Sequence, residues 1–330
     1  MRTLVTGGGG FIGSHLVRRL LEDGFSVRVL DNFATGRREN IADLKGEIEL
    51  VEGDIQSYER VHDAVRNCDY VVHLAALPSV PRSVQDPLTT NASNVTGTLN
   101  VLIASRDAQV SRLVCASSSS VYGATLVLPK HEDLPTAPIS PYAVSKLAGE
   151  GYCRSFHEIY GLSTVAVRFF NVFGPRQDPA SQYSAVIPRF ILAALQGQSP
   201  VVYGDGEQSR DFTFVENAVA GTILAMRAPD IHGGVFNVAS GARLTVNDMI
   251  ANLGVILQTE ITPEYRLDRP GDVKHSFADI ARARSQLGYE PSVSFAEGLR
   301  RTVDHYVALT DADRLPGQSG SERRRRRADR

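Results

Sequence analysis

A tyrosine and a lysine four positions apart are the residues of this chain best suited to acid–base chemistry. Tyr142 and Lys146 fall within a helix expected over 140–160, so their side chains share one helix face. A phenol acts as a base at neutral pH only when a nearby positive charge favours the phenolate, and Lys146 would supply that charge. Taken alone, the pair could equally be an ordinary helix-surface pair. The neighbouring sequence motifs must therefore distinguish the catalytic from the structural interpretation.

A run of serines lies ahead of this pair in the chain. Residues 117–120 are all serine and follow a strand expected over 112–116, about two dozen residues before Tyr142. Strand ends in parallel sheets point into the ligand crevice. A hydroxyl there, that of Ser118, can hydrogen-bond the substrate oxygen that Tyr142 deprotonates. We therefore predict Ser118, Tyr142 and Lys146 as the catalytic residues of an enzyme that moves a hydride.

A glycine-rich turn near the N-terminus predicts the hydride carrier. Gly7, Gly10 and Gly13 lie between a strand expected over 3–6 and an amphipathic helix expected over 11–21. A pyrophosphate approaches such a backbone closely only where no Cβ intervenes, and the helix N-terminus offers free N–H groups and a positive dipole end. The strand before the glycines and the helix after them make this a specific signal for a dinucleotide.

An aspartate indicates which dinucleotide is bound. Asp31 ends the second expected strand, 26–30, and follows Gly13 by eighteen positions, where a carboxylate accepts hydrogen bonds from the adenosine ribose. A carboxylate repels a 2′-phosphate, so NAD is expected rather than NADP. Arg37 and Arg38 could favour NADP, but we interpret them as exposed loop charges.

Alternating strands and helices would position these residues. Further strands are expected over 48–52, 70–74 and 164–169, with a helix over 94–107. Such alternation is typical of a parallel sheet with helices on both faces. In the second half of the chain prolines interrupt this rhythm, although a strand near 235–238 is expected to return to the main domain. The expected fold is an α/β Rossmann fold, a doubly wound parallel sheet with a smaller, partly interleaved α/β substrate-binding region.

The expected domain boundaries follow from this change of rhythm. We assign residues 1–170 to the dinucleotide-binding domain, 171–310 to the substrate-binding region and 311–330 to a disordered basic tail. The formal net charge of −2 gives no reason to expect nucleic acid or an anionic membrane as partner. No apolar run is long enough for a membrane span, and no signal peptide pattern is present, so we expect a cytoplasmic protein.

The cysteines indicate neither a disulfide framework nor a metal site. The chain has three, Cys68, Cys115 and Cys153, each among apolar neighbours. We expect all of them to be small buried side chains, and we expect no bound metal.

The chain resembles the extended short-chain dehydrogenases/reductases, and among them the nucleotide-sugar 4-epimerases. The matching motifs cover about residues 1–300. They are Thr6-Gly7-Gly8-Gly9-Gly10-Phe11-Ile12-Gly13, Asp31-Asn32, His73-Leu74-Ala75-Ala76, Asn94-x-x-Gly97-Thr98, Ser118, Tyr142-x-x-x-Lys146, the run from Arg168 to Arg176, Gly204-Asp205-Gly206, Arg210-Asp211 and Arg269-Pro270-Gly271-Asp272. The resemblance implies a tightly bound NAD, a UDP-sugar substrate and a homodimer formed through the helices near 94–105 and 142–160.

The resemblance also implies individual contacts. For NAD it implies Gly7, Gly10, Phe11, Ile12, Gly13, Asp31, Asn32, Asp54, Ile55, Leu74, Ala75, Ala76, Asn94, Tyr142 and Lys146. For the substrate it implies Ser79, Ser118, Ser119, Ser120, Asn171, Val186, Ile187, Tyr203, Arg210, Arg269, Asp272 and Ser276. In this set the two arginines and Asn171 would hold the diphosphate, Asp272 the uridine ribose, and Tyr203 with the backbone near 186–187 the uracil.

The implied reaction inverts C4 of the sugar. Tyr142 removes the proton of the 4-hydroxyl, the C4 hydride passes to NAD, and a transient 4-keto sugar turns about its diphosphate before the hydride returns to the opposite face. The alternative is a dehydratase or decarboxylase of the same superfamily. The 4,6-dehydratases carry an Asp-Glu pair where this chain has Ser119 and Ser120, so elimination would lack its proton carriers. A non-catalytic NAD-binding protein would be expected to lose Tyr142 or Lys146.

Three UDP-sugar pairs remain open: glucose/galactose, N-acetylglucosamine/N-acetylgalactosamine and glucuronate/galacturonate. Ser276 aligns with a position where a tyrosine restricts N-acetylated sugars, so a serine leaves room for them. The stretch 77–83 also resembles epimerases that take such sugars. The hydroxyls of residues 118–120 could bind a uronate carboxylate, whereas Asp178 stands where bacterial glucuronate epimerases commonly show arginine.

Overall fold

The structure is a computed structural model that describes residues 1–178, 186–229, 231–267 and 274–314. Arg269 and Asp272, both expected to bind substrate, lie outside the described residues, as does the greater part of the expected tail. Among the described helices none is both long enough and apolar enough to cross a membrane. No cluster of three potential metal ligands occurs in the described part of the chain.

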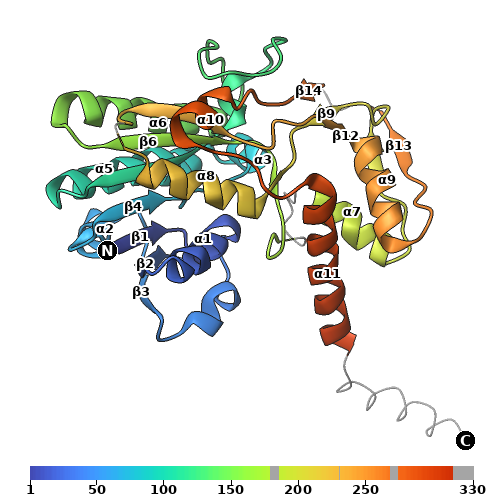
Figure 1. The fold of residues 1–330 in the computed structure, drawn as a ribbon, viewed down its shortest axis with the longest axis horizontal. Coiled ribbons are helices and arrows are strands. Elements are labelled where there is room, and N and C mark those ends of the chain that lie inside the picture. The colour runs from blue at the N-terminus through green and yellow to red at the C-terminus, as the bar shows by residue number, and fades with distance from the viewer. Residues whose placement is uncertain (179–185, 230, 268–273, 315–330) are drawn as a thin grey trace, which may run out of the picture.

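A parallel sheet of seven strands forms the centre of the molecule (Figure 1). Its order is β11-β6-β5-β4-β1-β2-β3. The strands are β1 (Arg2–Thr6), β2 (Ser26–Asp31), β3 (Ile48–Glu52), β4 (Tyr70–His73), β5 (Arg112–Ser118), β6 (Thr164–Phe169) and β11 (Gly234–Val238). The chain winds outward in opposite directions from β1 and from β4, so the topological switch point lies between these two strands. The predicted Rossmann fold is confirmed.

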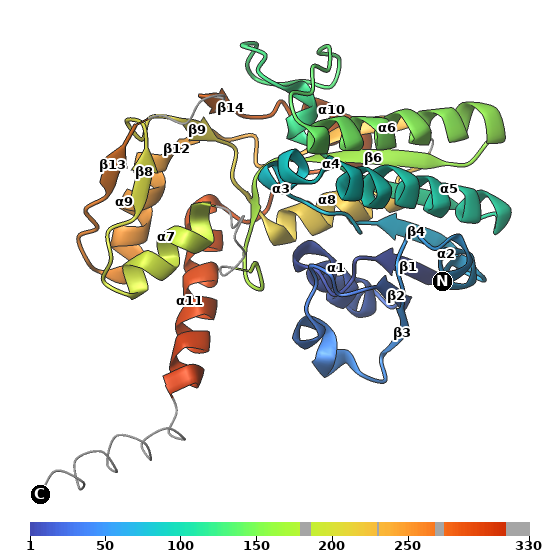
Figure 2. The same ribbon diagram turned by 180° about the vertical axis from the view of Figure 1, so that it is seen from behind.

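Helices cover both faces of this sheet. On one face lie α1 (Phe11–Glu22) and α8 (Val215–Arg227), and on the other α2 (Tyr58–Val65), α5 (Gly97–Asp107) and α6 (Pro141–Tyr160) (Figure 2). Because both faces are covered, β1, β2, β4, β5 and β6 are nearly continuous runs of buried residues, whereas no residue of the edge strand β3 is buried. Helix α6 begins where the Ser140 side chain accepts a hydrogen bond from the Ala143 amide, and it ends at Gly161, whose φ is 69°.

Shorter elements lie in the connections between the strands and helices of this domain. They are η1 (Arg38–Leu44), α3 (Val80–Gln85), α4 (Pro87–Asn91), the π-helical turn η2 (Ala92–Thr96), η3 (Ser119–Tyr122), β7 (Val172–Phe173) and β10 (Thr213–Phe214). The helix expected from residue 94 is therefore α5 from Gly97, preceded by a π-helical turn. In that turn Asn94 bonds both the amide and the carbonyl of Leu77 instead of pointing outward. The strand expected over 112–116 extends to Ser118, which carries the first serines into the sheet.

The substrate-binding region stands beside the sheet, as Figures 1 and 2 show. Its elements are α7 (Val186–Leu195), β8 (Val201–Tyr203), β9 (Ser209–Arg210), β12 (Leu244–Thr245), α9 (Val246–Leu257), β13 (Glu264–Arg266), β14 (His275–Ser276) and α11 (Phe295–Arg314). Helix α10 (Ala281–Leu287) packs instead on α8 and β11 of the main sheet. Strand β9 pairs with both β12 and β14, and this pairing brings Arg210 and Ser276 together. The intervening β11 pairs with β6 in the main sheet, so the two regions interleave.

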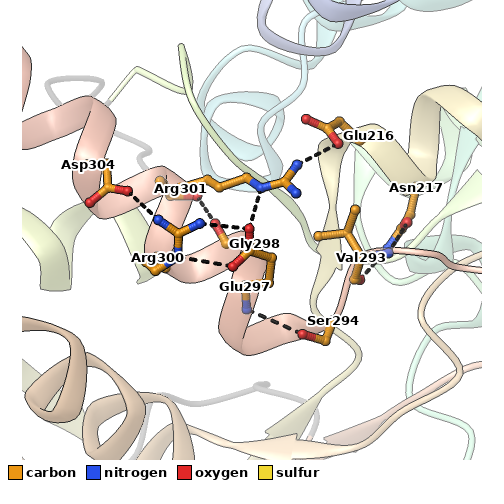
Figure 3. Close-up of polar contacts among 10 residues, drawn as sticks. Glu216, Asn217, Val293, Ser294, Glu297, Gly298, Arg300, Arg301 and Asp304 are labelled. Carbon is orange, nitrogen blue, oxygen red and sulfur yellow. Dashed lines mark hydrogen bonds and ion pairs between the residues drawn. The ribbon is translucent and has the colours of Figure 1, made fainter.

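Surface ion pairs attach the last helix to the nucleotide-binding domain. Arg301 of α11 bridges Glu297 on its own helix and Glu216 on α8, at 2.7 and 2.9 Å (Figure 3). The Asn217 side chain donates to the Val293 carbonyl at 2.8 Å and accepts from the Val293 amide. Helix α11 continues through Arg314, beyond residue 311 where the tail was expected to begin.

Candidate active site

The carboxyl ends of the strands open into a cavity of about 1250 Å³. It extends from the glycine turn after β1, past the serine end of β5, to Arg210 and Ser276 of the substrate-binding region. Its position at the switch point of the sheet is where a doubly wound fold binds its ligand.

The backbone of the glycine turn is packed so closely that it leaves no room for a Cβ at Gly7 or Gly13. Gly7 has a φ of 75°, and a Cβ there would lie 2.8 Å from the Ala75 nitrogen. A Cβ at Gly13 would lie 2.1 Å from the Gly7 carbonyl oxygen. Gly7 and Gly10 line the cavity just before α1, and Phe11, Ile12 and Gly13 line it from the first turn of that helix. The residues present therefore fit the pyrophosphate of a dinucleotide.

Asp31 is held in place by backbone amides. One carboxylate oxygen accepts from the Gly9 amide at 2.8 Å and the other from the Phe33 amide at 2.7 Å. Burial raises the pKa of this carboxyl, which these two hydrogen bonds partly offset. Each oxygen keeps a further lone pair that a ribose hydroxyl can use.

The two arginines that could have favoured NADP are engaged elsewhere. Arg38 forms a 2.6 Å ion pair with Glu52 and lies 4.3 Å from the centre of the Phe33 ring. Arg37 forms a 2.6 Å ion pair with Asp178. Both arginine side chains are about half exposed and pair with carboxylates, and Arg37 with its partner Asp178 also lines the cavity.

Most of the predicted cofactor contacts line this end of the cavity. They are Gly7, Gly10, Phe11, Ile12, Gly13, Asp31, Asn32, Asp54, Ile55, Leu74, Ala75, Ala76, Tyr142 and Lys146. Asn94 is not among these lining residues. It is buried, and its side chain joins Leu77 to the Ser145 hydroxyl of α6, so it positions the loop after β4.

Ser118, Tyr142 and Lys146 all line the middle of the cavity. The Lys146 ammonium donates to the Ala116 carbonyl of β5 at 2.9 Å, which ties α6 to the catalytic strand. The Tyr142 amide donates to the Ser83 hydroxyl at 3.0 Å, and the Ser118 hydroxyl accepts from the Ser120 amide at 3.2 Å. The structure thus brings the three predicted catalytic residues to one place beside the glycine turn.

A buried ion pair behind these residues was not foreseen from the sequence. Glu150 of α6 forms two hydrogen bonds with Arg168 of β6, at 2.8 and 2.7 Å, and accepts one from Ser117. Arg168 also lies 4.6 Å from the centre of the Tyr122 ring. Glu150 is one helical turn beyond Lys146, and that spacing was the only available signal. The pair joins α6 to β5 and β6 just below the catalytic residues.

The predicted substrate contacts divide into three groups. Ser79, Ser118, Ser119, Ser120, Asn171, Arg210 and Ser276 line the cavity. Val186, Ile187 and Tyr203 are not among its described lining residues. The Ile187 side chain is buried in the apolar core and Tyr203 ends strand β8, while the expected contact of uracil with the backbone near 186–187 stays a prediction. Arg269 and Asp272 lie outside the described residues.

Sequence reasoning missed one charged residue of the cavity, Lys130. It lines the cavity although it is only 2% exposed, and its ammonium donates to the Gly123 carbonyl at 3.2 Å. Burial lowers the pKa of this amine, and the nearby charge of Arg210 lowers it further. A single lysine in a Pro-Lys-His loop forms no pattern, so nothing in the sequence distinguished it from a surface charge.

Known proteins are similar to this chain over most of its length. The model of the NAD dependent epimerase/dehydratase family matches residues 3–239. A UDP-glucose 4-epimerase of Mycolicibacterium smegmatis is 39% identical over 93% of this chain and 98% of its own. A UDP-glucuronate 4-epimerase of Thermodesulfobacterium geofontis is 34% identical over 91% of this chain and 94% of its own.

Solved structures agree with this relationship. The UDP-N-acetylglucosamine 4-epimerase of Methanobrevibacter ruminantium, in complex with UDP-N-acetylmuramic acid, superposes with a TM-score of 0.90. It is 42% identical and covers 93% of this chain and 98% of its own. The predicted resemblance and the predicted NAD cofactor are confirmed. This chain belongs to the NAD dependent epimerase/dehydratase family.

Proposed function

We propose that this chain is a UDP-hexose 4-epimerase that works through a transient 4-keto sugar with tightly bound NAD. One observation carries the proposal. Ser118, Tyr142 and Lys146 share a cavity with the glycine turn, and the two positions that follow Ser118 in the chain, 119 and 120, are also serines. A hydroxyl is a poor proton carrier for eliminating water. The site can therefore remove the proton of the 4-hydroxyl and return it while NAD accepts and returns the C4 hydride, but it lacks the acid–base pair that a dehydratase requires.

The residues of the chain divide the work as follows. Tyr142 takes the proton of the 4-hydroxyl and later returns it, while Ser118 holds the same oxygen in line. Lys146, fixed to the Ala116 carbonyl, places a positive charge in the same cavity as Tyr142. When bound, NAD supplies the acceptor and then the donor of the C4 hydride. Arg210 and Asn171 line the cavity where they can hold the diphosphate while the sugar turns over.

A product analysis tests this function. The purified protein is incubated without added NAD with UDP-glucose, UDP-N-acetylglucosamine and UDP-glucuronate, and the products are separated and identified. Formation of a C4 epimer from at least one of the three supports the proposal. A 4-keto-6-deoxy sugar, release of carbon dioxide, or no reaction with any of the three would overturn it.

We further propose that the enzyme is a cytoplasmic homodimer. Helices α3, α4 and α6 pack against one another, and Val84, Leu88 and Val144 on them are 64, 82 and 52% exposed. An apolar surface of this kind is suited to covering by a second copy. Light scattering should give twice the mass of the chain, whereas a monomer at micromolar concentration would refute the dimer. The domain division at residue 170 likewise stays a prediction.

A further inference from the structure

We propose that Lys130 and Ser120 form a subsite for a sugar carboxylate, so that the preferred substrate is a UDP-hexuronate. The inference rests on the proposed 4-epimerase function and names the substrate class of that same site. It concerns two residues at the sugar end of the cavity whose hydrogen-bonding groups have fewer partners among the described residues than they can bind.

The backbone of Lys130 is fixed on both sides. Its amide donates to the Phe277 carbonyl at 2.9 Å, and its carbonyl accepts from the Asp279 amide at 2.8 Å and from the Asn237 side chain at 2.9 Å. The side chain is 2% exposed and lines the cavity. The ammonium is therefore placed by the fold and does not move freely as a surface lysine does.

This ammonium has no carboxylate partner within the described residues. An ammonium has three donors, and here one of them reaches the Gly123 carbonyl, while the Tyr122 ring centre lies 5.8 Å away. The charged group that acts on it is Arg210, which is also positive. A buried cation without a counter-charge is costly, and one beside a second cation is more so. An anionic ligand group in the cavity would offset this cost through a charge-assisted hydrogen bond.

Ser120 supplies a second, independent observation. Its hydroxyl is buried and has no hydrogen-bond partner among the described residues, although the residue lines the same cavity. It belongs to η3, the turn that leads directly to Gly123 and so to the Lys130 ammonium. A carboxylate has two oxygens and can accept from both donors at once.

The position of these two groups favours the C6 end of the sugar over the diphosphate. Ser120 follows Ser118, which in the proposed mechanism holds the oxygen on C4, and the C6 carboxylate of a hexuronate is carried by the adjacent ring carbon, C5. On the other side, Lys130 bonds the residue next to Ser276, which the resemblance places beside the sugar. Both neighbours are thus sugar-contacting positions.

Steady-state kinetics of the NAD-loaded protein test the subsite. We compare kcat/KM for UDP-glucuronate and for UDP-glucose in the wild type, in Lys130→Met and in Lys45→Met, a matched loss of an exposed lysine far from the cavity. The wild type should prefer UDP-glucuronate, and Lys130→Met should lower the acid-to-neutral ratio about 10- to 100-fold. Lys45→Met should keep the wild-type ratio. An equal loss on both sugars in Lys130→Met would assign the lysine to the diphosphate or to folding, and would overturn the subsite.

Two further measurements keep the test decisive if Lys130→Met does not fold. Ser120→Ala removes one neutral donor and should lower the same ratio less, by several-fold. In the wild type, UDP-glucuronate should compete with UDP-glucose more strongly than UDP-N-acetylglucosamine does, and the absence of that preference overturns the inference. If the enzyme epimerises neutral UDP-sugars without a preference for UDP-glucuronate, only the carboxylate subsite is refuted. If it epimerises none of the sugars, the proposed function is refuted.

Discussion

The cofactor end and the sugar end of the cavity are built in different ways. At the cofactor end the surface is backbone: Gly7 and Gly13 leave no space for a Cβ, and both oxygens of Asp31 already accept amide hydrogen bonds. At the sugar end the surface consists of side chains from separate segments. There the Ser120 hydroxyl and the Lys130 ammonium have fewer partners in the described part of the chain than they can bind. At the cofactor end the polar groups already have protein hydrogen-bond partners before the ligand binds. At the sugar end the remaining partners are expected to come from the sugar. Changes at the first should therefore affect cofactor retention and folding, and changes at the second should affect selectivity.

The largest effect is expected at Tyr142, where the two ends meet. Tyr142→Phe removes the proton carrier and keeps the ring, so turnover should fall by about 10³-fold or more while both ends of the cavity stay intact. Turnover is measured on the best UDP-sugar, with bound NAD and UDP-sugar affinity as controls. Near-normal turnover in this variant would remove Tyr142 from the mechanism.

Gly13→Ala is expected to disrupt the backbone of the glycine turn at the cofactor end of the cavity. The new Cβ would lie 2.1 Å from the Gly7 oxygen, a backbone atom that cannot rotate away, so the glycine turn must shift. We expect loss of co-purifying NAD and a decrease of about 1–3 kcal/mol in the free energy of unfolding. Gly151→Ala is the matched control, because a Cβ there meets nothing within 4 Å and alanine favours a helix. If both variants retain NAD equally, the glycine turn is not the tight cradle that its geometry indicates.

Ser276→Tyr alters the sugar end alone. A tyrosine in place of this buried, cavity-lining serine reduces the space beside the sugar. We expect kcat/KM for UDP-N-acetylglucosamine to fall about tenfold more than that for UDP-glucose, with NAD content unchanged. An equal fall for both sugars would show that residue 276 does not control the size of the sugar.

The same contrast explains what the sequence could predict. The cofactor end depends on residues close together in the chain, such as Gly7 to Gly13 with Asp31, so local spacing was enough to find it. The sugar end depends on tertiary placement: Lys130 reaches the cavity only because its loop pairs with residues 277–279. Strand and helix order followed from periodicity, but the π-helical turn before α5, in which the Asn94 side chain bonds Leu77, is not contained in that periodicity.

The smallest effect is expected on the outer surface, where neither end of the cavity is involved. Arg301→Gln removes the ion pairs to Glu297 and Glu216, whose side chains are 36 and 51% exposed (Figure 3). Exposed pairs of this kind contribute little, because water screens them and ordering long side chains opposes them. We expect the unfolding midpoint to fall by about 2 °C or less, with unchanged sugar selectivity. The difference should vanish in 1 M salt, where charges are screened beyond about 3 Å. A loss as large as that of Gly13→Ala, or a change in selectivity, would show that the attachment of α11 to α8 helps to shape the sugar end of the cavity.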